Sequence, residues 1–206
     1  WYVPHDIQGY INEAGESLLL ERLDSMFVTK MADDIPGAHD IQGRIGAYWH
    51  GNEPCHQILY FYNYLKQPWK CQEKLRYIMD TFYGNTPGSL SGNDDCGQMS
   101  AWYMFTVMGF YPVCPGTDQY VLGAPYFPYL KLRLPNGNIL EIKAEGVSDT
   151  RRYVQSLTIN GKKYDKLYIT HADLLKGGVW EFKMGTSPNK KRGQKAENKP
   201  YSLTNG

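Results

Sequence analysis

The residues with the clearest chemical potential are the adjacent carboxylates Asp94 and Asp95, which follow Gly92 and Asn93. The apolar side chains after them recur at helical spacing, so a helix with free N–H groups in its first turn should begin directly after the pair. One carboxylate could simply cap that helix. A cap uses one side chain, whereas this run supplies three that carry oxygen. We therefore predict that Asn93, Asp94 and Asp95 form an acid/base pair or a metal site.

A second group of polar residues surrounds Gly51 and contains His50, Asn52 and Glu53. Asn52 and Glu53 offer hard oxygens that suit calcium or a polyhydroxylated ring, and the glycine lets the backbone approach such a ligand closely. His50 is a further candidate for binding substrate. In the alternative interpretation, Glu53 caps the helix that follows and the histidines are core residues. Zinc is disfavoured, because His50 and His56 are six residues apart with no Cys or His partner at ligand spacing.

The sequence His-Asp-Ile-Gln-Gly occurs twice, at residues 5–9 and 39–43, with an offset of 34 residues. The segments around the two copies do not match, which argues against a helical repeat protein. We interpret both copies as connections between helices at one end of a helical barrel, where His5 and Asp6 would bind sugar hydroxyls. Alternatively, each aspartate only caps the helix that follows it.

Helical periodicity dominates before Pro112, and alternation dominates after it. Four helices are expected in the first part, over residues 18–27, 58–65 and 69–83 and in the segment after the Asp94–Asp95 turn. In the second part we expect strands at 129–134, 139–144, 156–159, 162–164, 167–170 and 179–184, with the first two joined as a hairpin. These patterns predict an α+β chain of three parts: a helical-barrel segment with catalytic loops at 1–112, an antiparallel β segment at 113–186, and a mobile or draped tail at 187–206.

The charge of the chain is nearly balanced, with 22 basic and 21 acidic residues, so no strong field favours nucleic acid or an anionic membrane. No apolar stretch approaches the ~20 residues that span a bilayer. The 17 tyrosines suit sugar rings, although core positions are the alternative explanation. We expect Cys55, Cys71 and Cys96 to lie in helices or at their starts as free thiols. The chain opens on Trp1, so we expect a mature or truncated piece.

Residues 51–54, 92–103 and 109–116 resemble the C-terminal part of the glycoside hydrolase family 92 α-mannosidases. The similarity extends from residues 3–7 to 184–185, and ordered agreement over several motifs is more specific than any one of them. The resemblance implies the C-terminal part of an (α/α)6 helical barrel followed by a small antiparallel β domain. It also implies a calcium-dependent, exo-acting enzyme that removes terminal α-linked mannose with inversion. An α-1,2 linkage is the expected preference, although the residues themselves leave the linkage open.

By the same resemblance, Asp95 matches the general base, and Asp94 and Asn93 would keep it ionised and orient the attacking water. Many relatives carry an aspartate where this chain has Asn93. Calcium would bind the 2- and 3-hydroxyls of mannose, with Asn52, Glu53, Asn93 and Asp95 as the pool of its ligands. The general acid is implied upstream of this chain, so residues 1–206 alone should be inactive.

The resemblance further implies mannose-containing glycans and the N-terminal domain of the same parent enzyme as partners, and a periplasmic or extracellular location. Two other classes stay open. A different (α/α)6-barrel carbohydrate enzyme, such as a glucosidase or a phosphorylase, would share the fold without needing calcium, but the acidic loops lack a basic cluster for phosphate. A noncatalytic sugar-binding module is disfavoured, because modules of this size are usually all strand.

Overall fold

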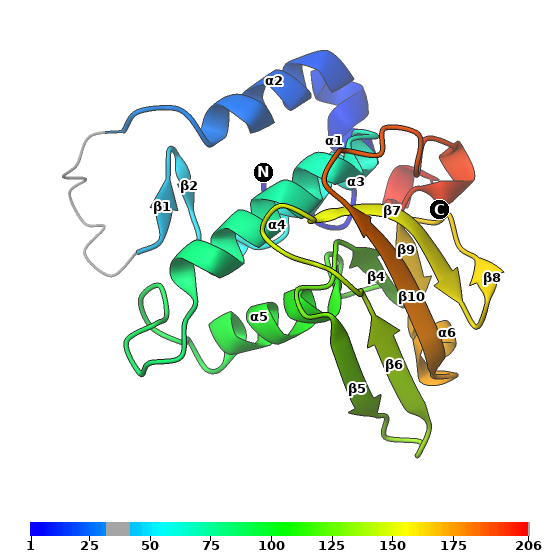
Figure 1. Ribbon diagram of the computed structural model, residues 1–206. Coiled ribbons are helices and arrows are strands. Elements are labelled where there is room, and N and C mark those ends of the chain that lie inside the picture. Colours follow the sequence, from blue (N-terminus) through cyan, green and yellow to red (C-terminus); the bar gives the residue numbers. More distant parts are fainter. Residues whose placement is uncertain (32–41, 206) are drawn as a thin grey trace.

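The computed structural model describes residues 1–31 and 42–205, so most of the second His-Asp-Ile-Gln-Gly copy lies outside the described residues (Figure 1). The helices are α1 (Ile7–Ala14), α2 (Glu16–Met26), α3 (Phe61–Tyr64), α4 (Pro68–Phe82), α5 (Gln98–Met108) and α6 (His171–Leu175). The strands are β1 (Arg44–Ile45), β2 (Tyr48–Trp49), β3 (Phe110–Tyr111), β4 (Gln119–Leu122), β5 (Tyr129–Arg133), β6 (Ile139–Lys143), β7 (Tyr153–Ile159), β8 (Lys162–Lys163), β9 (Tyr168–Thr170) and β10 (Gly178–Gly185). Four 3-10 turns complete the order: η1 (Glu53–Cys55), η2 (Ile58–Tyr60), η3 (Ala196–Asn198) and η4 (Leu203–Asn205).

The helix α4 follows directly from its sequence pattern. Leu75, Ile78 and Met79 are buried on one face, as the helical period requires, and Pro68 occupies the first turn, where its missing N–H is not needed. The helix predicted at 58–65 is instead η2 followed by the four-residue α3. The helix α3 cannot extend past this segment, because Lys66 adopts a left-handed φ of 57°.

The strands form a five-stranded sheet in the order β5-β6-β10-β7-β8, a three-stranded sheet in the order β3-β4-β9 and a two-stranded sheet of β1 and β2. The prediction of an antiparallel β segment is wrong for one pairing, because β10 runs parallel to β6 and antiparallel to β7. β10 lies between these two strands, which oppose each other in direction, so it can be antiparallel to only one of them. The strand predicted at 167–170 pairs with β4, which the alternation did not indicate.

Two apolar cores hold the chain, one among the helices and one under the larger sheet. Polar bonds join the two parts: the Asn63 amide donates to the Leu122 carbonyl at 2.7 Å, and the Val154 N–H donates to Gln72 Oε1 at 3.0 Å. Helix α5 leads directly into β3, and its Phe105 packs against the sheet core. The loop before α5 is therefore held in place by both parts of the structure.

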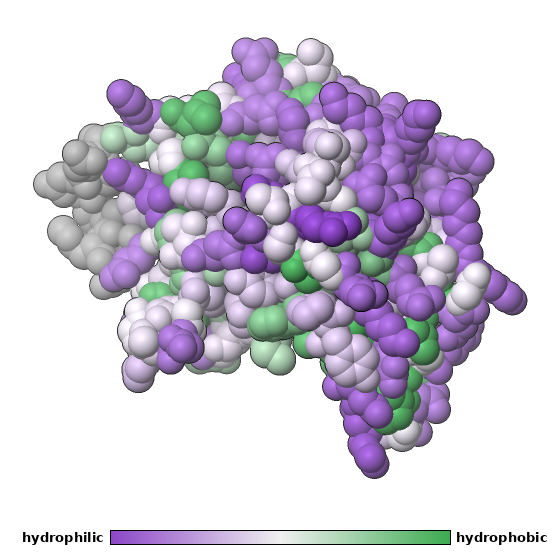
Figure 2. Space-filling view, viewed as in Figure 1, coloured by the Kyte–Doolittle hydropathy of each residue, from purple (hydrophilic) through white to green (hydrophobic). Residues whose placement is uncertain are grey.

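The tail at 187–205 lies against the rest of the chain, and η4 contacts α1 (Figure 1). Asn198 and Ser202 are buried, and the Leu167 N–H donates to the Asn198 carbonyl at 2.8 Å. Figure 2 shows a largely hydrophilic surface on one face of the molecule. Within the part of the chain that the structure describes, no helix combines the length and hydrophobicity that crossing a bilayer requires.

Candidate active site

The turn before α5 has an unusual backbone. Asp95, Cys96 and Gly97 adopt positive φ angles of 47°, 57° and 92° in succession. The left-handed region costs a residue with a side chain roughly 1–2 kcal/mol, and consecutive non-glycine residues seldom adopt it. Strain of this kind persists where the surrounding structure enforces it, often at functional sites. Cys96 is exposed in this turn, so the prediction that it begins a helix is wrong.

The two carboxylates of the turn have different partners. Asp94 Oδ1 accepts a hydrogen bond from the Ser100 N–H at 2.9 Å, and the Asp94 carbonyl accepts one from the Met99 N–H at 3.2 Å. Asp94 therefore satisfies free donors at the start of α5, as a cap does. Asp95 is exposed and is not needed for capping. Asp94 is thus the capping residue, and Asp95 is the additional carboxylate that the sequence led us to expect.

Asp95 meets Glu53, which comes from the other predicted chemical centre. A hydrogen bond between the two carboxyl groups raises the pKa of Asp95, and partial desolvation and the charges of Glu53 and Asp94 add to that rise. Two ionised carboxylates offer only acceptors, so such a bond needs a shared proton. A cation between them would remove the need for that proton, because it would stabilise both charges.

The donor set around this pair fits a calcium ion in part. Asn52 donates through Nδ2 to Cys55 Sγ at 3.7 Å, which leaves its side-chain oxygen available, and Asn93 is exposed directly before Asp94. Calcium takes six to eight hard oxygen ligands. Among residues 1–31 and 42–205, however, no three His, Cys, Asp or Glu side chains gather as a metal-holding group. Backbone carbonyls, water, sugar hydroxyls or the remainder of a longer protein would have to complete the shell.

Glu53 also lines a cleft of 420 Å³. Its polar lining includes Gln57, Gln98 and Tyr111, and its apolar lining includes Pro4. Gln57 is only 5% exposed, and its Nε2 has no hydrogen-bond partner among the described residues. A buried unpaired donor costs roughly 1–3 kcal/mol, which a ligand oxygen in the cleft would recover.

Gln98 faces the same cleft with a fixed orientation. Its Nε2 donates to His56 Nδ1 at 3.1 Å and to the Tyr111 hydroxyl at 3.1 Å, which uses both of its hydrogens. Its side-chain oxygen is therefore the group left for a ligand. Neither Gln57 nor Gln98 was expected in the site from the sequence. Their signal was weak, since each is a neutral amide at the edge of an apolar segment.

The histidines form a buried layer behind the cleft. His50 is 0% exposed, bonds the hydroxyls of Tyr48 and Tyr83 at 3.0 and 2.7 Å, and has its ring 4.3 Å from that of Trp102. Burial, with the neighbouring His56, lowers the pKa of His50 to about 2. The prediction that His50 binds substrate is therefore corrected, because a core histidine has no surface to offer a sugar.

His56 orients Gln98. Its Nε2 donates to the His50 carbonyl at 2.9 Å, so its Nδ1 is the acceptor for the Gln98 amide. Burial lowers the pKa of His56 to about 4.

His5 and Asp6 are not among the residues that line the cleft, and their role in binding sugar stays a prediction. Asp6 accepts from the Gly9 N–H, capping α1, and from the hydroxyls of Ser202 and Thr204, both at 2.6 Å. The same bonds hold the pKa of Asp6 well below its ordinary value. Its carboxylate fastens the tail to α1, and the alternative of a capping aspartate is confirmed for this copy. His39 and Asp40 lie outside the described residues.

Comparison with known proteins gives close structural matches. The family GH92 alpha-mannosidase BT3965 from Bacteroides thetaiotaomicron, solved in complex with mannoimidazole, is 57% identical with a TM-score of 0.96, over 98% of this chain and 27% of that chain. The family GH92 inverting mannosidase BT2199 from the same organism is 36% identical with a TM-score of 0.86, over 99% of this chain and 29% of that chain. An uncharacterized secreted glycosidase from Arthroderma benhamiae is 28% identical over 189 residues, which is 90% of this chain and 22% of that protein.

This chain therefore spans only about a quarter of the length of its relatives. The mixed α+β structure, with its helices and three sheets, matches part of a family 92 enzyme. Residues 1–186 match the sequence model of the glycosyl hydrolase family 92 catalytic domain. The chain belongs to glycosyl hydrolase family 92.

Proposed function

We propose that the enzyme containing this chain is an exo-acting α-mannosidase that removes terminal α-1,2-linked mannose from glycans with inversion and requires calcium. Family membership supports the reaction class. One relative is described as an inverting mannosidase, and another was solved with mannoimidazole, a mannose mimic. The observation that carries the proposal is the exposed Asp95 carboxylate, spared from capping by Asp94 and facing Glu53 beside a polar cleft.

Asp95 is the proposed general base. Inverting hydrolysis needs a carboxylate that takes a proton from a water molecule as the water attacks the sugar from the face opposite the leaving group. Asp95 suits this role, because its turn is fastened by Asp94 while its own carboxyl group remains exposed. The left-handed backbone at Asp95 and Cys96 sets the direction of the Cα–Cβ bond from which the carboxylate extends.

Glu53 is not the general acid in this proposal. The acid and base of an inverting enzyme stand ~6.5–9.5 Å apart, so that a sugar and a water fit between them. A hydrogen bond between Glu53 and Asp95 requires a much shorter separation. We therefore assign the acid to a part of the parent enzyme outside this chain, and Glu53 to binding sugar or metal.

The residues present also suggest how mannose is held. A calcium ion bound near Glu53 and Asp95 would supply positive charge that keeps both carboxylates ionised and attracts vicinal sugar hydroxyls. Gln57 offers an unpaired donor, and Gln98 offers an oxygen whose direction is fixed by His56. A donor and an acceptor side by side suit neighbouring hydroxyls, which can each give and receive a hydrogen bond.

The test uses the full parent enzyme with an aryl α-mannoside and with α-1,2-linked mannobiose. We expect release of mannose that stops in chelator and returns with added calcium, and β-mannose as the first anomer seen by proton NMR. First release of α-mannose would refute inversion, and full activity in chelator would refute the calcium requirement. The name of the secreted relative supports a location outside the cytoplasm, which fractionation of the source cells would check.

A further inference from the structure

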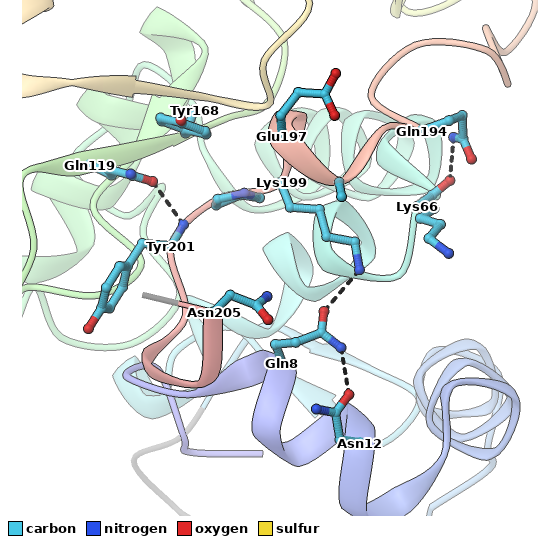
Figure 3. Close-up of a pocket in the computed structure, with 12 residues that line it drawn as sticks. Gln8, Asn12, Lys66, Gln119, Tyr168, Gln194, Glu197, Lys199, Tyr201 and Asn205 are labelled. Carbon is cyan, nitrogen blue, oxygen red and sulfur yellow. Dashed lines mark hydrogen bonds between the residues drawn. The ribbon is translucent and has the colours of Figure 1, made fainter.

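A second polar groove lies away from the Glu53 cleft, between α1 and the tail (Figure 3). Its volume is 780 Å³, larger than that of the cleft. Gln8 and Asn12 on α1 form one side of it, Gln119 on β4 and Tyr168 on β9 lie on another, and Lys199 of the tail reaches between them. None of the proposed catalytic steps uses these residues.

Hydrogen bonds within the groove fix the direction of its amides. Gln119 lines the groove, and its Oε1 accepts from the Tyr201 N–H at 2.8 Å, which leaves the Gln119 amino group available. Asn12 Oδ1 accepts from Gln8 Nε2 at 2.9 Å, which likewise leaves the Asn12 amino group available. Gln194 donates through Nε2 to the Lys66 carbonyl at 2.8 Å, so its oxygen is left over. The groove thus presents preset donors and an acceptor.

The chemistry of this lining selects a neutral polyhydroxylated ligand. Its charged residues are Lys66, Lys199 and Glu197, a net of only one positive charge, and Lys199 already donates to Gln8 Oε1 at 2.9 Å. Tyr168 and Tyr201 add half-buried aromatic surface of the kind on which sugar rings pack. Amide side chains with available donors and acceptors can form hydrogen bonds with hydroxyl groups, so the ligand needs no charge.

The groove and the cleft lie near each other, because residues close together at the start of the chain line both of them. Pro4 lines the cleft and Gln8 lines the groove, and four residues span at most about 14 Å. We propose that the groove is a second glycan-binding site, which holds a distal branch of an oligomannose glycan while its terminal mannose occupies the Glu53 cleft. This inference rests on the proposed function for the identity of the glycan.

The test compares a large and a small substrate on the full parent enzyme. The variant combines Asn12→Ala with Gln119→Glu, which removes both free amino groups but keeps the oxygen that binds the Tyr201 N–H. Loss of two hydrogen bonds should raise KM about tenfold for a branched oligomannose glycan. KM for an aryl α-mannoside should not change, because that substrate cannot reach the groove. Asn136→Ala, in the turn between β5 and β6, is the matched control and should change neither.

An unchanged KM for the large glycan would overturn the proposal, as would an equal rise for both substrates. If the parent shows no mannosidase activity, the proposed function fails, and calorimetry with the oligomannose glycan still tests the groove. Binding that is weakened in the double variant supports the site, whereas equal binding by variant and wild type refutes it. A groove filled by another segment of the parent enzyme would give this second result.

Discussion

Gln57 allows a test in which stability and binding should change in opposite directions. Its side chain is 5% exposed, and the amide nitrogen lacks a partner among the described residues. Replacing Gln57 with Leu removes that donor and keeps a side chain of similar size. Because a buried unpaired N–H costs roughly 1–3 kcal/mol, the free energy of unfolding in the absence of sugar should rise by a similar amount.

The same change should weaken binding of mannose mimics. One hydrogen bond to a sugar oxygen is lost, which corresponds to roughly a tenfold increase in Kd. Denaturant unfolding of the parent enzyme measures the first effect, and calorimetry with mannoimidazole measures the second.

Gln72 provides the control for this experiment. It is also buried, at 3% exposed, but its Oε1 accepts from the Val154 N–H at 3.0 Å. Gln72→Leu should therefore lower the free energy of unfolding by about 1–3 kcal/mol, because Val154 loses its acceptor. A Gln57→Leu variant that is destabilised as much as Gln72→Leu would refute the reasoning. Unchanged sugar affinity in Gln57→Leu would remove Gln57 from the binding site.

Three further predictions concern the base, the tail and the chain itself. Asp95→Asn should lower kcat of the parent by roughly 10²–10⁴-fold with little change in KM, and near-normal turnover would exclude it as the base. Asp6 has a lowered pKa, so its contribution to stability is fully present above the ordinary value of 3.8 and is lost progressively as the pH falls from there toward the lowered pKa. Asp6→Asn should therefore speed proteolysis of the tail, relative to the wild type, more at pH 7 than at pH 2, and an equal effect at both would contradict the assignment. Residues 1–206 alone should release no mannose from an aryl α-mannoside with calcium, and clear release would show that an acid lies within them.

Much of the local structure was predictable from the order of residues. The helical spacing of Leu75, Ile78 and Met79 indicated α4, and alternation indicated the β5–β6 hairpin. These patterns are predictive because each element buries one face, and the apolar residues of that face recur at the helical or strand period. The Asn-Asp-Asp run predicted a site because it holds more carboxylates than capping needs, and that site stays a prediction. The later family match agrees with the resemblance that these motifs carried.

Other features depended on partners that lie far away in the sequence. Asp94 caps α5 while Asp95 stays exposed, and this difference follows from the left-handed turn, which local propensity does not predict. β10 is parallel to β6 because it lies between β6 and β7, and the strand order is set by the tertiary fold.

The tertiary structure also decided which polar residues are satisfied within the fold and which stay available to a ligand. Asp6 binds Ser202, 196 residues away, so a residue that looked suited to sugar fastens the tail. Gln57 looked unremarkable in the sequence, yet burial beside the cleft leaves its amide nitrogen without a partner among the described residues. Sequence alone determined the types and spacing of the chemical groups. Only packing determined which of them remain unpaired, because hydrogen bonds between distant segments satisfy some groups and leave others for a ligand.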